Sequence, residues 1–166
     1  MTVLENVLVG MHCRTRAGIA GILLGTPAVT DEVRRSRERA ESLLGLFGER
    51  LLPRVAEPAW TLSYANRRRL EIARALATEP RLLLLDEPAA GMNPTETREL
   101  MRDIVRIRDQ GVTILLIEHD MGLVRGVCER VVALDHGTKI AEGTFETVRD
   151  TPEVLEAYLG RRGGRA

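Results

Sequence analysis

Lysine is nearly absent from this sequence. Lys139 is the only lysine among the 166 residues, so arginines make up the rest of the 24 basic residues. A phosphate-binding loop of the pattern G-x-x-x-x-G-K-[ST] needs a lysine directly after a glycine. Lys139 follows Thr138 in a predicted hairpin turn, and its neighbours on both sides do not fit the pattern. The sequence therefore contains no such loop.

Cysteines and long apolar runs are also scarce. The two cysteines, Cys13 and Cys128, stand far apart and outside any metal-ligand spacing, which favours a reducing compartment such as the cytoplasm. The longest apolar stretch near the start, residues 17–24, is too short to cross a bilayer, and no signal peptide is visible. The 24 acidic residues balance the 24 basic ones, which removes the electrostatic reason to expect a nucleic-acid partner. We therefore expect a soluble protein that reaches a membrane only through a partner.

The first half of the sequence is predicted to be mostly helical. Thr2 and Glu5 form a T-x-x-E capping box that opens a short helix. Residues 13–30 are predicted to be irregular, whereas residues 31–46 have a strongly helical pattern with a charged side that we expect to face solvent. After a proline-containing loop, apolar residues recur at helical spacing from about Ser63 to a proline stop.

The pattern changes to strands alternating with helices in the second half. An unbroken apolar run at 82–85 predicts a strand buried on both faces, and residues 112–117 predict a second buried strand. The helix predicted between them, at 95–109, makes this a right-handed βαβ unit with parallel strands. The remaining predicted elements are a helix at 121–128, strands at 130–134 and 139–141 joined by a turn, and helices at 145–149 and 152–159.

Acidic residues and a histidine follow the two predicted parallel strands. Asp86 and Glu87 end the first strand, and Glu118 and His119 end the second. Ligands of open parallel sheets bind beyond the carboxyl ends of the strands. A carboxylate near Mg²⁺ and a second that orients or deprotonates water are typical of phosphate-hydrolysing sites, where a histidine can contact the terminal phosphate. Each feature alone would also fit loop and helix-cap chemistry, but their convergence on one predicted edge favours the hydrolytic site.

Four segments, in this order, resemble the motifs of ABC-type ATPases. They are LSYANRRRLEIARAL at 62–76, LLLLDEP at 82–88, AAGMNP at 89–94 and IEHD at 117–120, similar to the signature helix, Walker B segment, D-loop and switch segment. The resemblance implies an α/β fold of the P-loop NTPase type, with a parallel sheet and a helical subdomain, incomplete at the N-terminus. It implies a helical subdomain at 1–80 that includes the signature motif, an α/β core at 81–160 and a tail at 161–166.

The resemblance also implies roles for single residues. Asp86 would lie beside the Mg²⁺ ion, and Glu87 would be the general base that polarises the attacking water. His119 would contact the γ-phosphate of ATP. Asn93, in the D-loop segment, would belong to the nucleotide-binding surface.

The signature segment departs from the family pattern. In the family this helix end faces the γ-phosphate of ATP held by the opposite subunit, which fits the attraction of a helix N-terminus for phosphate. Ser63 would supply a hydroxyl to the nucleotide, and Tyr64 is tolerable at its position in the subfamily. Ala65 stands where glycine is expected, and Asn66 where glutamine is expected. We expect the methyl group of Ala65 to weaken this nucleotide contact without abolishing it.

A narrower resemblance points to the ATP-binding subunits of branched-chain amino acid importers. It is carried by residues 2–7, 69–74, 87–94, 116–121 and 156–160. It implies ATP and Mg²⁺ as cofactors, ATP hydrolysis coupled to transport, and a second ABC ATPase subunit, identical or different, closing head to tail. It also implies transmembrane permease subunits as partners and a cytoplasmic, peripheral location on the inner face of the cell membrane. Related systems carry other small solutes, such as urea or amides.

The resemblance covers roughly the last two-thirds of such a subunit, because the phosphate-binding loop and the glutamine loop are absent. A missing upstream segment, a truncated gene model and a degenerate gene all explain this. We expect the isolated chain to be poorly stable, with an exposed apolar strand edge at 82–85, and to bind Mg-ATP weakly or not at all.

Two other functions compete with the importer ATPase. The chain would alternatively be a non-catalytic partner or remnant that offers its signature face to a complete ATPase, which Ala65 and Asn66 slightly favour. An ABC-type ATPase of DNA repair is disfavoured by the balanced charge and the lack of long coiled coils. The permease contact is expected within residues 1–60, although an ordinary helical subdomain packed on the core fits that pattern equally well.

Overall fold

The computed structural model describes residues 1–14 and 26–159, which divide into two compact units between Ile117 and Glu118. We describe each unit by itself. The predicted boundary between a helical subdomain and an α/β core, at residue 80, lies within the first unit and stays a prediction, as does the tail at 161–166, which is outside the described residues. In the two described ranges, no helix combines the length and apolarity that crossing a bilayer requires.

The first unit opens with the helix that the capping box predicts. Helix α1 (Val3–Gly10) begins after Thr2, whose side chain accepts a hydrogen bond from the Glu5 amide while the Glu5 carboxylate accepts one from the Thr2 amide. Helix α1 packs against α4 (Tyr64–Leu76), the helix predicted to start near Ser63. A side chain at Gly10 would collide with the backbone carbonyl of Arg74, so glycine lets the two helices approach closely.

The second helix is longer than the periodicity predicts. Helix α3 (Pro27–Gly45) begins four residues before the expected start at Asp31. Pro27 stands in its first turn, a position at which proline is favoured because its fixed φ suits a helix start. Residues 15–25 of the segment predicted to be irregular lie outside the described residues. One short 3₁₀ turn, η1 (His12–Arg14), precedes α3. Three more lie between α3 and α4: η2 (Gly48–Arg50), η3 (Leu52–Arg54) and η4 (Ala59–Thr61).

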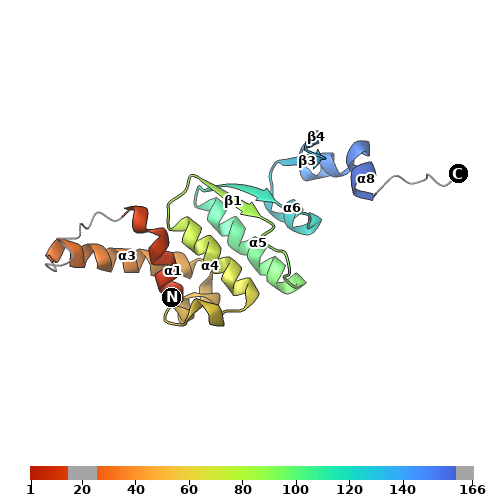
Figure 1. Ribbon diagram of the computed structural model, residues 1–166. Helices are drawn as coiled ribbons and strands as arrows, with labels where there is room; N and C mark the ends of the chain where they lie inside the picture. Colours follow the sequence, from red (N-terminus) through yellow and green to blue (C-terminus); the bar gives the residue numbers. More distant parts are fainter. Residues whose placement is uncertain (15–25, 160–166) are drawn as a thin grey trace. The chain divides into compact units, whose positions relative to one another are not determined.

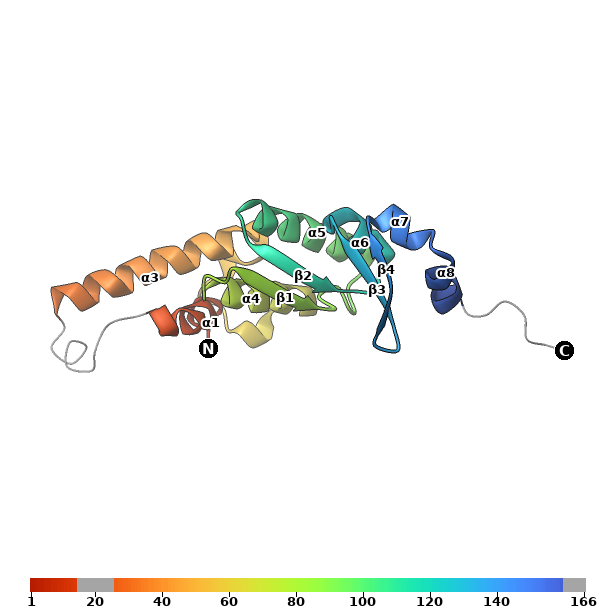
Figure 2. The same cartoon turned by 90° about the horizontal axis from the view of Figure 1, so that it is seen from above.

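A parallel two-stranded sheet completes the first unit. Strand β1 (Leu82–Asp86), helix α5 (Pro94–Asp109) and strand β2 (Thr113–Ile117) form the predicted βαβ unit. The register pairs Leu82 with Thr113 and Asp86 with Ile117. Helices α4 and α5 lie along one face of this sheet (Figures 1 and 2). Leu83 and Leu85 are buried on β1, with 4% and 7% of their surface exposed.

The opposite face of the same sheet is open, so the prediction that 82–85 is buried on both faces is wrong. Four large apolar side chains are exposed there: Leu82 (50%), Leu84 (65%), Leu115 (54%) and Ile117 (59%). The described residues also supply β1 with one strand neighbour only, which leaves its other edge unpaired. An apolar run shows that a strand can be covered on both sides, but not that covering elements exist. The expected poor stability of the isolated chain stays a prediction that this open face supports.

The second unit is a small α/β segment. Helix α6 (Met121–Val127) is followed by the antiparallel strands β3 (Val131–Asp135) and β4 (Thr138–Gly143) and by helices α7 (Phe145–Arg149) and α8 (Pro152–Leu159). His136 and Gly137 both have positive φ, of 45° and 81°, as a two-residue hairpin turn requires. The predicted hairpin around Lys139 is therefore confirmed.

Candidate functional site

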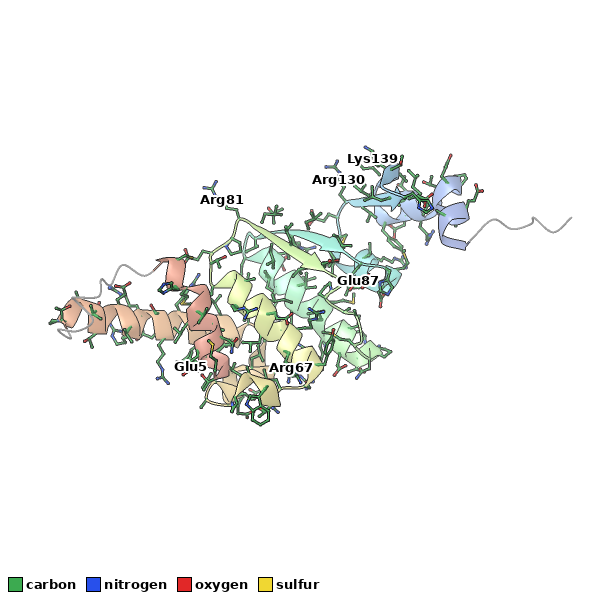
Figure 3. All side chains as sticks on the ribbon, in the orientation of Figure 1. Glu5, Arg67, Arg81, Glu87, Arg130 and Lys139 are labelled. Carbon is green, nitrogen blue, oxygen red and sulfur yellow. The ribbon has the colours of Figure 1, made fainter. Side chains whose placement is uncertain are left out.

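Asp86 and Glu87 stand at the carboxyl end of β1, and both are exposed. Figure 3 shows Glu87 at one end of the strand and Arg81 at the other. The Glu87 amide donates a hydrogen bond of 2.9 Å to the carbonyl oxygen of Ile117, which fixes this residue to the end of β2. Its φ of 43° lies in the left-handed region, which is uncommon for a residue other than glycine. Strained backbone of this kind concentrates at functional sites, where the surrounding structure holds it in place.

The loop that follows Glu87 is a series of tight turns that ends in a helix cap. The Ala90 amide donates to the Glu87 carbonyl (3.1 Å), the Met92 amide donates to the Ala89 carbonyl (3.0 Å), and Gly91 has a φ of 75°. Asn93 then caps α5, because its side-chain oxygen accepts hydrogen bonds of 3.0 Å from the backbone amides of Thr95 and Glu96. The side chain of Asn93 is thus already used within the chain, and its predicted nucleotide contact stays a prediction.

The four predicted residues of the signature segment divide into an exposed pair and a buried pair. Ser63 caps α4, with its hydroxyl oxygen 3.3 Å from the Asn66 amide, and both Ser63 and Tyr64 are exposed. Ala65 and Asn66 are only 3% and 8% exposed. The methyl group that we expected to crowd a phosphate therefore lies in the interior of the unit. This leaves Ser63 and the amino end of α4 as the surface available to an anion.

A buried arginine, which the sequence patterns did not single out, joins the two helices behind the site. Arg69 of α4 is 1% exposed, and its guanidinium donates to Asp103 (2.9 Å) and Glu99 (3.1 Å) of α5 and to the Asn66 side chain (3.2 Å). Burial raises the pKa of the Asp103 carboxyl above its usual value, and the Arg69 guanidinium opposes that shift. Arg69 falls on the apolar side of its helix, next to Leu70, and that position was the available signal for its burial.

His119 belongs to the second unit, just before helix α6. The Glu118 carboxylate accepts hydrogen bonds from the backbone amides of His119 (3.1 Å) and Asp120 (3.4 Å), and Asp120 caps α6 through the Leu123 amide (3.0 Å). The imidazole of His119 is 70% exposed. Asp86 and Glu87 belong to the other unit, so their convergence with His119 on one pocket stays a prediction.

Asp86 is the residue expected to lie beside the magnesium ion, and that role stays a prediction. Within the ranges that the structure describes, no three histidine, cysteine, aspartate or glutamate side chains gather to hold a metal. Mg²⁺ on nucleotide enzymes is commonly held by one or two carboxylates together with phosphate oxygens and water. The exposed carboxylate of Asp86 at a strand end suits that role, in which the nucleotide supplies the other ligands.

A surface hollow of about 220 Å³ lies elsewhere on the first unit, between α1, η4 and α4. Trp60, which is 75% exposed, stands at this hollow with Arg67 and Arg74. Arg67 donates to the backbone carbonyl of Leu62, and no carboxylate of the described residues lies within ion-pair distance of either arginine. The hollow is lined by Asn6, Ala59, Trp60, Arg67, Leu70, Glu71 and Arg74.

Comparisons with known proteins agree with the sequence motifs. Residues 1–90 match the family described as ABC transporter, and residues 138–163 match the one described as branched-chain amino acid ATP-binding cassette transporter. The chain is 46% identical over 161 residues to the high-affinity branched-chain amino acid transport ATP-binding protein LivG of Salmonella typhimurium, and 44% identical to BraF of Pseudomonas aeruginosa. Each match covers 96% of this chain but only 62% of the relative.

Solved structures give the same answer for the fold. The chain is similar to the ADP conformation of MJ1267, an ATP-binding cassette of an ABC transporter, with a TM-score of 0.75 and 28% identity over 97% of this chain and 63% of that one. A nucleotide-free ATP-binding cassette gives a TM-score of 0.76 at 28% identity, over 97% of this chain and 64% of that one. The predicted α/β fold is therefore confirmed.

Proposed function

Because the chain belongs to the ABC transporter family, we propose that it is the ATP-binding part of an importer for branched-chain amino acids. The family that the motifs indicated is thereby confirmed. The observation that carries the proposal is the continuous similarity to LivG, at 46% identity over 96% of this chain. A match of that extent spans the strand-end acids and the signature segment, and the second family matches residues 138–163. The solute rests on the names of LivG and BraF.

The proposed mechanism assigns one task to each of four predicted residues. Mg²⁺ would lie beside the Asp86 carboxylate and neutralise charge on the phosphates of ATP. The Glu87 carboxylate would accept a proton from water while the water oxygen bonds to the γ-phosphorus and the bond between that phosphorus and ADP breaks. His119 would donate a hydrogen bond to the γ-phosphate. The amino end of α4, with Ser63, would face the γ-phosphate bound by a second ATPase subunit.

We predict that the chain alone binds Mg-ATP with a dissociation constant above about 1 mM, because nothing in its sequence can replace the phosphate-binding loop. Isothermal titration calorimetry of the purified chain measures this affinity. The matched comparison is the same chain joined behind a segment that carries G-x-x-x-x-G-K-[ST], for which we expect micromolar binding and ATP hydrolysis. Micromolar binding by the chain alone would contradict the prediction.

A second candidate is a non-catalytic partner that offers α4 to a complete ATPase, which Ala65 and Asn66 at the expected glycine and glutamine positions slightly favour. Ser63 and the helix end are exposed, as that role requires. The joined chain separates the two candidates. Hydrolysis by the joined chain supports the ATPase subunit. An inactive joined chain that stimulates a complete ATPase subunit would support the non-catalytic partner.

We place the contact with the transmembrane permease subunits at the hollow beside Trp60, which includes Trp60 of the expected range 1–60 and extends beyond that range to Arg67 and Arg74. Its exposed indole offers an apolar anchor, and Arg67 and Arg74 lack carboxylate partners among the described residues. A permease segment with an apolar side chain and a carboxylate would complement this surface. Such a contact would hold the subunit peripherally on the inner face of the cell membrane.

Trp60→Ala and Arg74→Glu should each weaken the affinity of the joined chain for the permease subunits by about tenfold or more, since the few interface residues that cost about 2 kcal/mol or more when truncated are enriched in tryptophan and arginine. Binding is measured in detergent by titrating labelled permease. Arg81→Glu is the control, because Arg81 is exposed at the start of β1, away from the hollow (Figure 3). Equal losses in all three variants, or none, would place the contact elsewhere.

A further inference from the structure

Tyr64, the first residue of α4, lies against the loop that follows Glu87. A methyl group built on Gly91 would stand 3.5 Å from Cε1 of the Tyr64 ring and 3.9 Å from its Cζ. These are ordinary van der Waals distances, so the ring lies beside the turn at Gly91. Two segments 27 residues apart in the sequence, the signature end of α4 and the loop 87–93, therefore lie next to each other within one chain.

The ring is held from the side of α4 as well. The Arg68 guanidinium lies 5.5 Å from the ring centroid, and its Nε donates a hydrogen bond of 3.3 Å to the Tyr64 hydroxyl. Arg68 is in turn paired with Glu71 at 2.9 Å. The guanidinium contacts the ring face as well as the hydroxyl, so this contact with the half-exposed ring does not depend on the hydroxyl alone.

A second connection runs through the interior, one turn further along α4. Arg69 binds Asp103 and Glu99, and one of its Nη atoms is 3.5 Å from the carbonyl oxygen of Glu96 in the first turn of α5. Glu96 closes the capping box of Asn93, where the loop ends. The loop is therefore connected to α4 near its middle by Tyr64 and at its end by Arg69.

We propose that Tyr64 is a positioning residue that couples the amino end of α4 to the loop 87–93 of the same chain. The functional meaning rests on the proposed function: Ser63 would face a nucleotide in one site, and Glu87 would act in another. A shift of α4 that follows nucleotide contact at Ser63 would then be transmitted to the backbone of Glu87 through the Tyr64 ring. An aromatic ring is required for this, and the hydroxyl is not.

Amide hydrogen exchange, measured by NMR on the whole chain without nucleotide, tests the coupling. The reporters are the Ala90 and Met92 amides, which are hydrogen-bonded inside the loop and belong to neither helix. Tyr64→Ala should speed their exchange about five- to tenfold, because the loop loses its aromatic contact. Tyr64→Phe keeps the ring and should leave both rates within about twofold of the unmodified chain. The Ile104 amide, inside α5, should not change in either variant.

Unchanged exchange at Ala90 and Met92 in Tyr64→Ala would overturn the proposal. So would equal acceleration in Tyr64→Phe, which would assign the effect to the hydroxyl, or equal acceleration at Ile104, which would report a loss of overall stability. Since no nucleotide is present, the result does not depend on whether the chain or the joined chain binds ATP. A failure of the proposed function in the titration therefore leaves this test intact.

Discussion

Arg69→Met is expected to lower the free energy of unfolding by about 3 to 5 kcal/mol, as measured by urea denaturation followed by circular dichroism. Methionine fills much of the same space but removes the guanidinium that Asp103 and Glu99 share. The side chain of Asp103 is 7% exposed and that of Glu99 is 19% exposed, so neither carboxylate regains full hydration. Arg69→Lys should lower the free energy of unfolding by less, because the ammonium keeps the positive charge. Some loss remains, since lysine lacks the fork of parallel donors that arginine provides.

The control for this loss is Arg37→Ala, which breaks an ion pair of similar length at the surface. Arg37 is 2.9 Å from Glu41 but 63% exposed, so at most about 1 kcal/mol should be lost. The two losses should also respond differently to pH. Without Arg69 the pKa of Asp103 rises further above its unfolded value, so the folded variant gains stability as pH falls through that folded pKa. A small, pH-independent loss in Arg69→Met would contradict the buried network.

Local sequence signals predicted the order and type of the elements because the physics that sets them is local. The capping box at Thr2, the helix start near Ser63 and the glycine turn at Gly137 each depend on residues close together in the sequence, and the structure shows all three. The two-sided burial of β1 failed for the opposite reason. Burial of Leu84 depends on elements distant in sequence, and the described residues leave it 65% exposed.

The candidate site could be predicted as a set of residues but not as a set of contacts. The motifs placed Asp86 and Glu87 at a strand end, and the structure puts them there. They could not show that the Asn66 side chain accepts a hydrogen bond from Arg69, because a motif names residue types and not their partners. The cap at Asn93 did have a local signal, since Asn93 and Glu96 have capping-box spacing around Pro94. The left-handed backbone of Glu87 was equally invisible, since only distant packing enforces such a conformation.

Glu87→Gln, made in the chain joined to a phosphate-binding segment, should reduce ATP turnover by about a hundredfold or more and leave Mg-ATP affinity within about twofold. The amide has almost the same shape as the carboxylate, so the left-handed backbone and its hydrogen bond to Ile117 persist. What the amide cannot do is accept a proton from water at neutral pH. Phosphate release measures turnover, and calorimetry measures affinity.

Glu79→Gln is the matched control, because Glu79 is also an exposed glutamate with positive φ, of 53°, but lies beyond the end of α4. Turnover that survives Glu87→Gln would remove Glu87 from the role of base, and equal loss of turnover in both variants would report disturbed folding.

Glu87→Gly adds a test of the strain itself. Glycine adopts this φ freely, so it should stabilise the fold by up to about 1 kcal/mol while turnover falls as in Glu87→Gln. Higher stability with lost turnover would show that the strained position is kept for its carboxylate.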